Sequence, residues 1–93
     1  MIQSYKCKET AKLFETGISR KFPTSILKSA LIRLAMINRS GKLDDLKIPP
    51  SNHLEKLSGD REGQYSIRIN SKYRICFKWQ INNAYDVEIV DYH

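Results

Sequence analysis

Apolar residues recur every three or four positions in the first half of the chain and alternate with polar residues in the second half. A spacing of three to four is the period of a helix that buries one side, and strict alternation is the period of a strand with one buried face. The pattern therefore predicts a helical part followed by a sheet. The proline-containing segment 49–52 separates the two parts, and it marks a change of layer within one domain that spans residues 1–93.

Two helices are predicted in the first half, after a short first strand at residues 2–5. The first helix covers residues 8–16 and ends at Gly17, a residue type that caps helices at the C-terminus. The second opens with the Pro-Thr-Ser sequence at 23–25, which favours a helix start, and ends between residues 38 and 41. The apolar positions expected to face the core are Ala11, Leu13 and Phe14 in the first helix and Leu27, Ala30, Leu31, Leu34 and Ala35 in the second.

Four strands are predicted after the proline-containing segment. They cover residues 53–57, 65–70, 73–79 and 85–91. Short polar connections join the last three strands, which therefore form an antiparallel meander, and a charged turn framed by glycines lies before them. One face of this sheet should be buried under the helices and carry Ile67, Ile69, Ile75, Phe77, Val87 and Ile89, with Tyr65, Tyr73 and Tyr85 packed beside them.

The other face of the predicted sheet carries basic residues. Because side chains alternate along a strand, Arg68, Arg74 and Lys78 stand on the face that the helices do not cover. Glu88 and Tyr92 share this face if the last strand is regular. The predicted fold class is therefore α+β: two N-terminal helices on one side of a mostly antiparallel, twisted sheet, with an open basic face on the other side that suits phosphate binding.

The distribution of charge supports an acidic partner. The net charge is +6 and the isoelectric point is about 9.5, values that favour nucleic acid, an acidic protein or a membrane surface as partner. Residues 1–50 carry ten basic and four acidic residues, whereas residues 51–93 carry six of each. Within the second half, residues 65–80 hold four basic side chains, Lys72 among them, and no acidic one.

Several classes of protein are not expected from this composition. No apolar run approaches the roughly 18 residues that cross a membrane, and the first residues lack the apolar region of a signal peptide, so a cytoplasmic protein is predicted. Cys7 and Cys76 are far apart and without metal-ligand spacing, and we expect two reduced thiols, no metal site and no cofactor. No glycine-rich phosphate loop or nucleophile elbow is present.

Two groups of residues are candidates for chemistry. Arg68 and Arg74 on adjacent strands can converge on one phosphate and stabilise the charge of a phosphorane-like transition state, although a solvated strand face gives the same spacing. Asp91, Tyr92 and His93 combine a carboxylate, a phenol and an imidazole, the groups that transfer protons in metal-independent RNA cleavage. A frayed terminus is the alternative interpretation of this ending.

Three stretches of the sequence resemble one family. They are Pro49 to Glu55, the Gly-Asp-Arg-Glu-Gly turn at 59–63 with the strands that follow it to Phe77, and the ending Val87 to His93. Together they resemble the HigB toxins of bacterial toxin–antitoxin modules, in the RelE/ParE superfamily. The resemblance runs nearly end to end and implies the RelE-like fold described above.

The resemblance also implies an activity and its residues. HigB toxins are mRNA endonucleases that cut translated messages in the ribosomal A site. Their partner is a HigA antitoxin with a helix-turn-helix domain, and the complex binds operator DNA through the antitoxin. Carried across by position, Arg74 would hold the scissile phosphate, and Asp91, Tyr92 and His93 would complete the catalytic site. The expected RNA-binding residues are Arg61, Arg68, Lys56, Lys72 and Lys78.

The chain departs from the family pattern before the Gly-Asp-Arg turn. Where studied members carry a His and a Lys, this chain has Glu55 and Ser58, with His53 and Lys56 nearby but out of phase. A slower nuclease or substitution by Lys56 would follow.

Three hypotheses result from these observations. The first is a ribosome-dependent mRNA endonuclease that inhibits translation. The second is an inhibitor that binds a protein target such as gyrase. The third is a weakly active toxin that acts mainly as a corepressor with its antitoxin.

Overall fold

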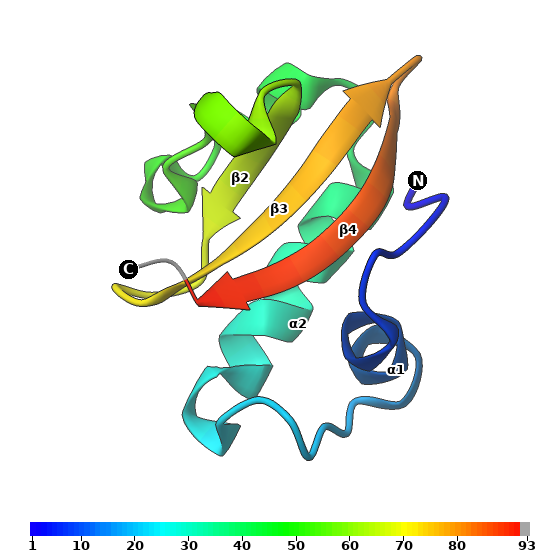
Figure 1. Cartoon of the computed structure of the whole chain (residues 1–93), viewed down its shortest axis with the longest axis vertical. Helices are drawn as coiled ribbons and strands as arrows, with labels where there is room; N and C mark the ends of the chain where they lie inside the picture. The colour runs from blue at the N-terminus through cyan, green and yellow to red at the C-terminus, as the bar shows by residue number, and fades with distance from the viewer. Residues whose placement is uncertain (92–93) are drawn as a thin grey trace.

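Two helices cover one face of a four-stranded antiparallel sheet in the computed structural model, which describes residues 1–91 (Figure 1). The helices are α1 (Lys8–Thr16) and α2 (Thr24–Arg39), and the strands, in spatial order, are β1 (Glu55–Lys56), β2 (Gln64–Arg68), β3 (Tyr73–Gln80) and β4 (Asn83–Asp91). Short 3-10 helices connect the two parts: η1 (Leu43–Lys47), η2 (Pro50–Asn52) and η3 (Gly59–Arg61). The predicted α+β fold, with two N-terminal helices on an antiparallel sheet, is confirmed.

The helix boundaries follow the local signals in the sequence. Gly17 adopts φ 76° directly after α1, and its N–H donates a 2.7 Å hydrogen bond to the carbonyl of Leu13. The fully buried residues of α2 are Ile26, Ala30, Leu34 and Ile37. The buried stripe is therefore rotated from the predicted one, since Leu27, Leu31 and Ala35 are only half-buried at its margin.

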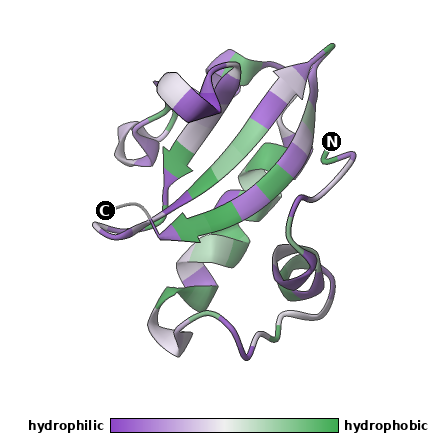
Figure 2. Cartoon of the chain, viewed as in Figure 1, coloured by the Kyte–Doolittle hydropathy of each residue, from purple (hydrophilic) through white to green (hydrophobic). Residues whose placement is uncertain are grey.

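The hydrophobic core fills the space between α2 and the three long strands. Hydrophobic segments gather on α2 and on the parts of β3 and β4 that cross it (Figure 2). The sheet contributes Ile67, Ile69, Ile75, Phe77, Val87 and Ile89, all buried, which is the predicted inner face. Tyr65 and Tyr73 pack against this core, as predicted. The alternation of β2 and β3 was therefore interpreted correctly.

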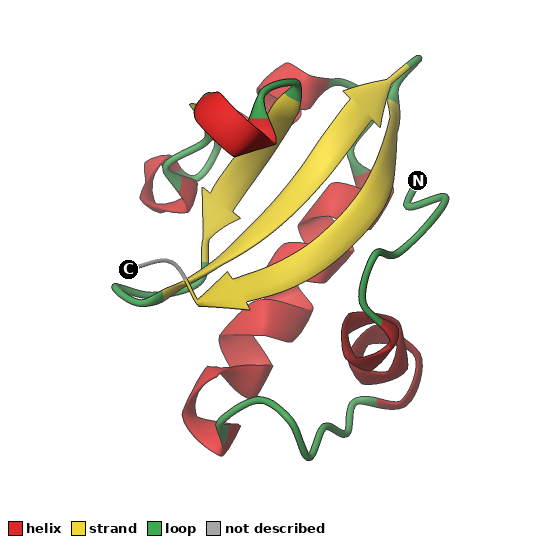
Figure 3. Ribbon diagram, viewed as in Figure 1, coloured by secondary structure: helices red, strands yellow, loops and turns green. Residues whose placement is uncertain are grey.

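The N-terminal segment runs along the outer edge of β4 without forming a continuous strand (Figure 3). Ile2 makes an isolated parallel bridge with Ala84, and Tyr5 makes another with Val87. The strand predicted at residues 2–5 is thus reduced to two contacts. The segment still protects the edge of the sheet, because the Val87 carbonyl accepts the N–H of Lys6 at 3.1 Å.

A β-bulge in β4 changes which residues face the core. Cys76 lies opposite Glu88 and Lys78 lies opposite Tyr85, so two steps along β3 match three along β4. The extra residue, Asp86, has φ 52°. As a result Tyr85 lies on the face of Lys78, and the prediction that Tyr85 packs with the inner set was wrong. Alternation along a sequence does not reveal an inserted residue.

The face of the sheet opposite the helices is only partly open. The predicted strand at 53–57 is shortened to β1, because His53 has φ 45° and leaves the extended conformation. The chain from His53 through η3 then lies over part of this face (Figure 1). Arg74 is 8% exposed and Cys76 is fully buried there. The open basic face of the prediction is therefore covered at these two positions.

Candidate functional site

A pocket opens where β1, β2 and β3 meet the loop that joins β2 to β3. Its volume is about 330 Å³, and its lining residues are His53, Glu55, Arg68, Asn70, Ser71 and Arg74. We call it the arginine pocket. Arg68 and Arg74 lie directly opposite each other on β2 and β3, so their alternating positions bring both side chains to the same face. Both arginines line this pocket, and their binding of one phosphate remains a prediction.

Arg74 is held in place by groups from two neighbouring segments. Its Nε donates to Ser66 Oγ at 2.8 Å, and its Nη2 donates to the carbonyls of His53 at 2.6 Å and of Ser66 at 3.4 Å. The Glu55 carboxylate lies 3.5 Å from the same Nη2. A buried guanidinium with several acceptors is oriented before any ligand binds, which reduces the entropy that an anion must overcome on binding.

Arg68 is the more accessible cation of the pocket. Its Nε donates to the carbonyl of Asn70 at 3.0 Å, which fixes the guanidinium beside the turn after β2. Among residues 1–91, no carboxylate lies within 4 Å of this side chain. Arg68 can therefore pair with an incoming phosphate without first breaking an ion pair with a carboxylate.

Glu55 places a carboxylate in the arginine pocket. It lies opposite Ser66, and therefore on the Arg74 side of the sheet, and its side chain is 54% exposed. Lys56, the next residue, lies opposite Tyr65 and alternates toward the helix side. Ser58 precedes η3 and does not line the pocket. The departure predicted at Glu55 therefore puts an acidic group in the pocket.

Of the three C-terminal candidates, Asp91 lies within the described residues. Asp91 ends β4 opposite Tyr73, and its carboxylate lies 3.6 Å from Nζ of Lys72 in the β2–β3 turn. Lys72 follows Ser71, which lines the pocket. Tyr92 and His93 lie outside the described residues.

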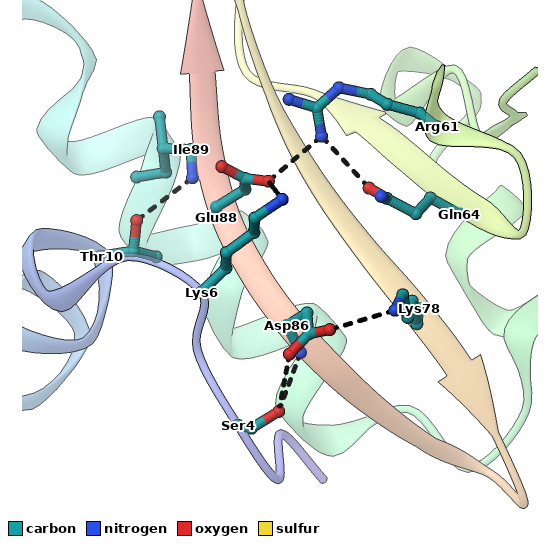
Figure 4. Close-up of polar contacts among 9 residues, drawn as sticks. All are labelled: Ser4, Lys6, Thr10, Arg61, Gln64, Lys78, Asp86, Glu88 and Ile89. Carbon is teal, nitrogen blue, oxygen red and sulfur yellow. Dashed lines mark hydrogen bonds and ion pairs between the residues drawn. The ribbon is translucent and has the colours of Figure 1, made fainter. Parts of the chain in front are cut away.

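Arg61, another of the predicted RNA-binding residues, belongs to an ion-pair network on the outer face of the sheet. Arg61 donates to Gln64 Oε1 at 3.2 Å and to Glu88 Oε2 at 3.1 Å, and Lys6 lies 3.8 Å from the same Glu88 oxygen (Figure 4). This network ties η3 and the N-terminal segment to β4. It lies over the middle of the sheet and lines no part of the arginine pocket.

A second group of contacts holds the bulge of β4. The N–H of Asp86 donates to Ser4 Oγ at 2.9 Å, and its carboxylate lies 3.3 Å from Nζ of Lys78 (Figure 4). Because both charged side chains are nearly half exposed, the pair contributes little to stability, about 0–1 kcal/mol. Lys78 can therefore exchange this partner for a phosphate at low cost.

Neither cysteine lies in the arginine pocket. Burial raises the pKa of the Cys76 thiol. Burial alone would also raise that of Cys7, but hydrogen bonds from Thr10 and Glu9 and the charge of Lys21 lower the pKa of Cys7 overall. The thiol of Cys7 contacts Lys21 Nζ at 3.8 Å. Both cysteines are free thiols, as predicted.

Sequence reasoning missed three parts of the site: the Glu55 carboxylate, the Ser66 hydroxyl and the His53 carbonyl. Ser66 has the same parity as Arg68, so alternation alone placed it on the correct face. Glu55 was seen only as a departure from a family pattern. The His53 carbonyl had no signal, since its direction depends on a positive φ at a residue that rarely adopts one.

The fold and the pocket together define a class of protein. The arrangement resembles the solved YoeB–YefM complex from Staphylococcus aureus, with a TM-score of 0.57 at 18% identity, covering 100% of this chain and 98% of that chain. This likeness shows a shared fold. The sequence also matches, over residues 3–93, the family described as the RelE-like toxin of type II toxin-antitoxin system HigB.

The chain therefore belongs to the HigB-like toxin family. It is 34% identical over 80 residues to Toxin HigB-1 of Vibrio cholerae, covering 85% of this chain and 84% of the relative. It is 33% identical to Endoribonuclease HigB of Proteus vulgaris over 93 residues, the full length of both chains. Among residues 1–91, no helix is long and apolar enough to span a membrane.

Proposed function

We propose that this protein is the toxin of a type II toxin–antitoxin module and cleaves mRNA on the ribosome without a metal ion. The observation that carries the proposal is the arginine pocket, where Arg74 is fixed beside Glu55 and faces Arg68. Two guanidinium groups and a carboxylate in one pocket supply charge stabilisation and a proton acceptor for phosphodiester cleavage. The relative named Endoribonuclease HigB supports this activity.

The proposed reaction is attack of a ribose 2′-hydroxyl on the neighbouring phosphate. The new bond joins the 2′-oxygen to phosphorus, and the bond to the 5′-oxygen of the next nucleotide breaks, leaving a cyclic phosphate. Arg74 and Arg68 hold the non-bridging oxygens, whose charge increases in the transition state. Glu55 accepts the proton of the 2′-hydroxyl, because its partly exposed carboxylate lies against the phosphate-binding guanidinium.

The leaving 5′-oxygen needs a proton in this reaction. We assign that step to the C-terminal group of Asp91, Tyr92 and His93, in which the imidazole has the pKa closest to neutrality. Asp91 and Lys72 extend the site from the pocket toward this ending. In-line displacement requires the proton acceptor and the proton donor to act on opposite sides of the phosphate.

The remaining cations are proposed to contact RNA along the face around the pocket. Lys72 and Lys78 are about half exposed, and their ion pairs are weak enough to be replaced by phosphates. Arg61 reaches the same face from η3. Lys56 alternates toward the helix side and would contact RNA only at the exposed edge formed by β1. Such contacts hold the strand while the pocket positions the reacting phosphate.

The proposed partner is an antitoxin of the HigA type, with a helix-turn-helix domain through which the complex binds operator DNA. The toxin then acts in the cytoplasm, where ribosomes and messages are found. The family membership of the chain supports an antitoxin partner.

The decisive experiment is cleavage of a translated message by the purified toxin on purified ribosomes, with chelator present. We expect cuts inside the reading frame, and we expect Arg74→Ala, and deletion of His93 alone, to abolish both cleavage and growth arrest. If both variants remained fully toxic, the site assignment would be wrong. Intact messages with damaged DNA would support a gyrase inhibitor instead, and intact messages with retained operator repression would support a corepressor.

A further inference from the structure

A second cavity lies at the C-terminal end of α2 and takes no residue from the sheet. Its volume is about 430 Å³, and its lining residues are Met36, Arg39, Ser40, Asp45, Ile48 and Pro49. We call it the helix-end groove. It shares no residue with the arginine pocket. A ligand in this groove would therefore not need to touch the proposed catalytic groups.

The helix-end groove is lined in part by apolar side chains, one of which is exposed. Both Ile48 and Met36 line it, and Ile48 is 76% exposed whereas Met36 is half-buried. Ile32 is 45% exposed and lies one turn before Met36 on α2, so it extends the apolar strip along the helix. Exposed apolar residues that adjoin a concave surface are typical of a site for another protein.

The charged residues around this strip are mainly basic. Arg39 lines the groove, and Lys28 lies one turn before Ile32 on the same side of α2. Both cations are exposed, and among residues 1–91 neither has a carboxylate within 4 Å. The one acidic residue of the lining, Asp45, accepts the N–H groups of Gly41 and Lys42, each at 3.1 Å, and so caps a turn of the chain itself.

The apolar strip and its two cations distinguish between the kinds of acidic partner that a basic chain can bind. RNA is bound by clustered cations and by aromatic rings on which bases stack, and the lining of the helix-end groove contains no aromatic residue and one arginine. An apolar strip with a cation at each end instead fits a peptide segment that presents apolar side chains between acidic ones. The complementary partner is therefore a protein.

We propose that the helix-end groove and the adjoining strip of α2 bind an apolar, acidic segment of the antitoxin. The proposal rests on the proposed function, which supplies the antitoxin as partner. Because the groove shares no residue with the arginine pocket, the bound antitoxin neutralises the toxin by keeping it from the ribosome and does not need to fill the catalytic site.

The test measures binding of the purified antitoxin encoded beside this toxin, by calorimetry, to toxin variants. Ile48→Lys and Arg39→Glu are expected to weaken binding at least tenfold each, while cleavage on ribosomes stays within threefold of wild type. Both side chains are exposed, so folding should be retained, which thermal unfolding checks. Ile81→Lys is the matched control, since it makes the same change at a 91% exposed position in the β3–β4 turn, outside either pocket.

The outcomes separate this proposal from the proposed function. Affinity within twofold of wild type in both groove variants would overturn the docking site, as would an equal loss in the Ile81→Lys control. Loss of ribosomal cleavage with unchanged antitoxin affinity would also overturn it and assign the groove to the ribosome. Hydrogen exchange on the wild-type complex is a second measurement, and protection should appear at residues 32–49 but not in the β2–β3 turn. A toxin that fails to cleave mRNA leaves the binding result intact.

Discussion

Glu55→Gln is the substitution that most directly tests the proposed catalytic pocket. It keeps the shape of the side chain but removes its charge and its capacity to accept a proton. Arg74 retains its hydrogen bonds to Ser66 and to the His53 carbonyl, so its position should not change. Since the Glu55 side chain is more than half exposed, losing the ion pair should lower stability by about 0–1 kcal/mol.

The expected loss of activity is much larger than this loss of stability. A general base contributes roughly a factor of 10² to 10⁴ to a rate. At about 1.36 kcal/mol for each factor of ten, that is about 3–5 kcal/mol of the activation barrier. Glu55→Gln should therefore reduce cleavage at least about 100-fold while the protein remains folded.

The assay is single-turnover cleavage of a message on ribosomes saturated with toxin, across a range of pH. Glu88→Gln is the matched control, because Glu88 is also paired with cations, Arg61 and Lys6, but lies outside the arginine pocket. Glu88 is only 16% exposed, so its substitution should reduce stability more than Glu55→Gln does. The reasoning fails if Glu55→Gln cleaves within threefold of wild type, or if Glu88→Gln loses as much activity.

Three further predictions concern stability and thiol chemistry. Thr10→Val should cost about 1–3 kcal/mol in chemical denaturation, because the buried Thr10 hydroxyl accepts the N–H of Ile89 at 3.1 Å; an unchanged midpoint would contradict it. Ile81→Asn should raise the melting temperature, because the β-branched Ile81 adopts φ 47° in a tight turn. Each 1 kcal/mol of stability gained corresponds to roughly 4–8 °C. A lower melting temperature would show that Ile81 is not strained. Iodoacetamide should label Cys7 at a lower pH than an ordinary thiol, because the pKa of Cys7 is lowered. Cys76 is buried and should react only after unfolding. Mass spectrometry would detect both labels, and labelling of Cys76 first would contradict both assignments.

Much of the fold follows from short-range signals. The helical spacing and the cap at Gly17 located α1, and the alternation of β2 and β3 placed Arg68 and Arg74 on the same face. These features are local because a helix or strand presents side chains with a fixed period. The placement of Arg68 and Arg74 on one face depends only on this period and was therefore predictable from the sequence.

The bulge in β4 could not be predicted in this way. Asp86 keeps its positive φ because contacts from distant segments stabilise it: Ser4 bonds to its backbone and Lys78 lies against its carboxylate. Because of the one added residue, each side chain of β4 that precedes the bulge points to the face opposite the one that strict alternation predicts. Tyr85 was placed on the wrong face for this reason, while Val87 and Ile89, beyond the bulge, were placed correctly.

The sequence by itself determined that two arginines share one face of an antiparallel sheet beneath which two helices pack. Only the tertiary structure decided what surrounds them. The His53 carbonyl reaches Arg74 across 21 positions of the chain, and Glu55 arrives with it, so a charged residue expected on an open surface is buried and oriented in a pocket. Periodicity assigns a side chain to a face, but its neighbours depend on how loops of irregular backbone fold over that face.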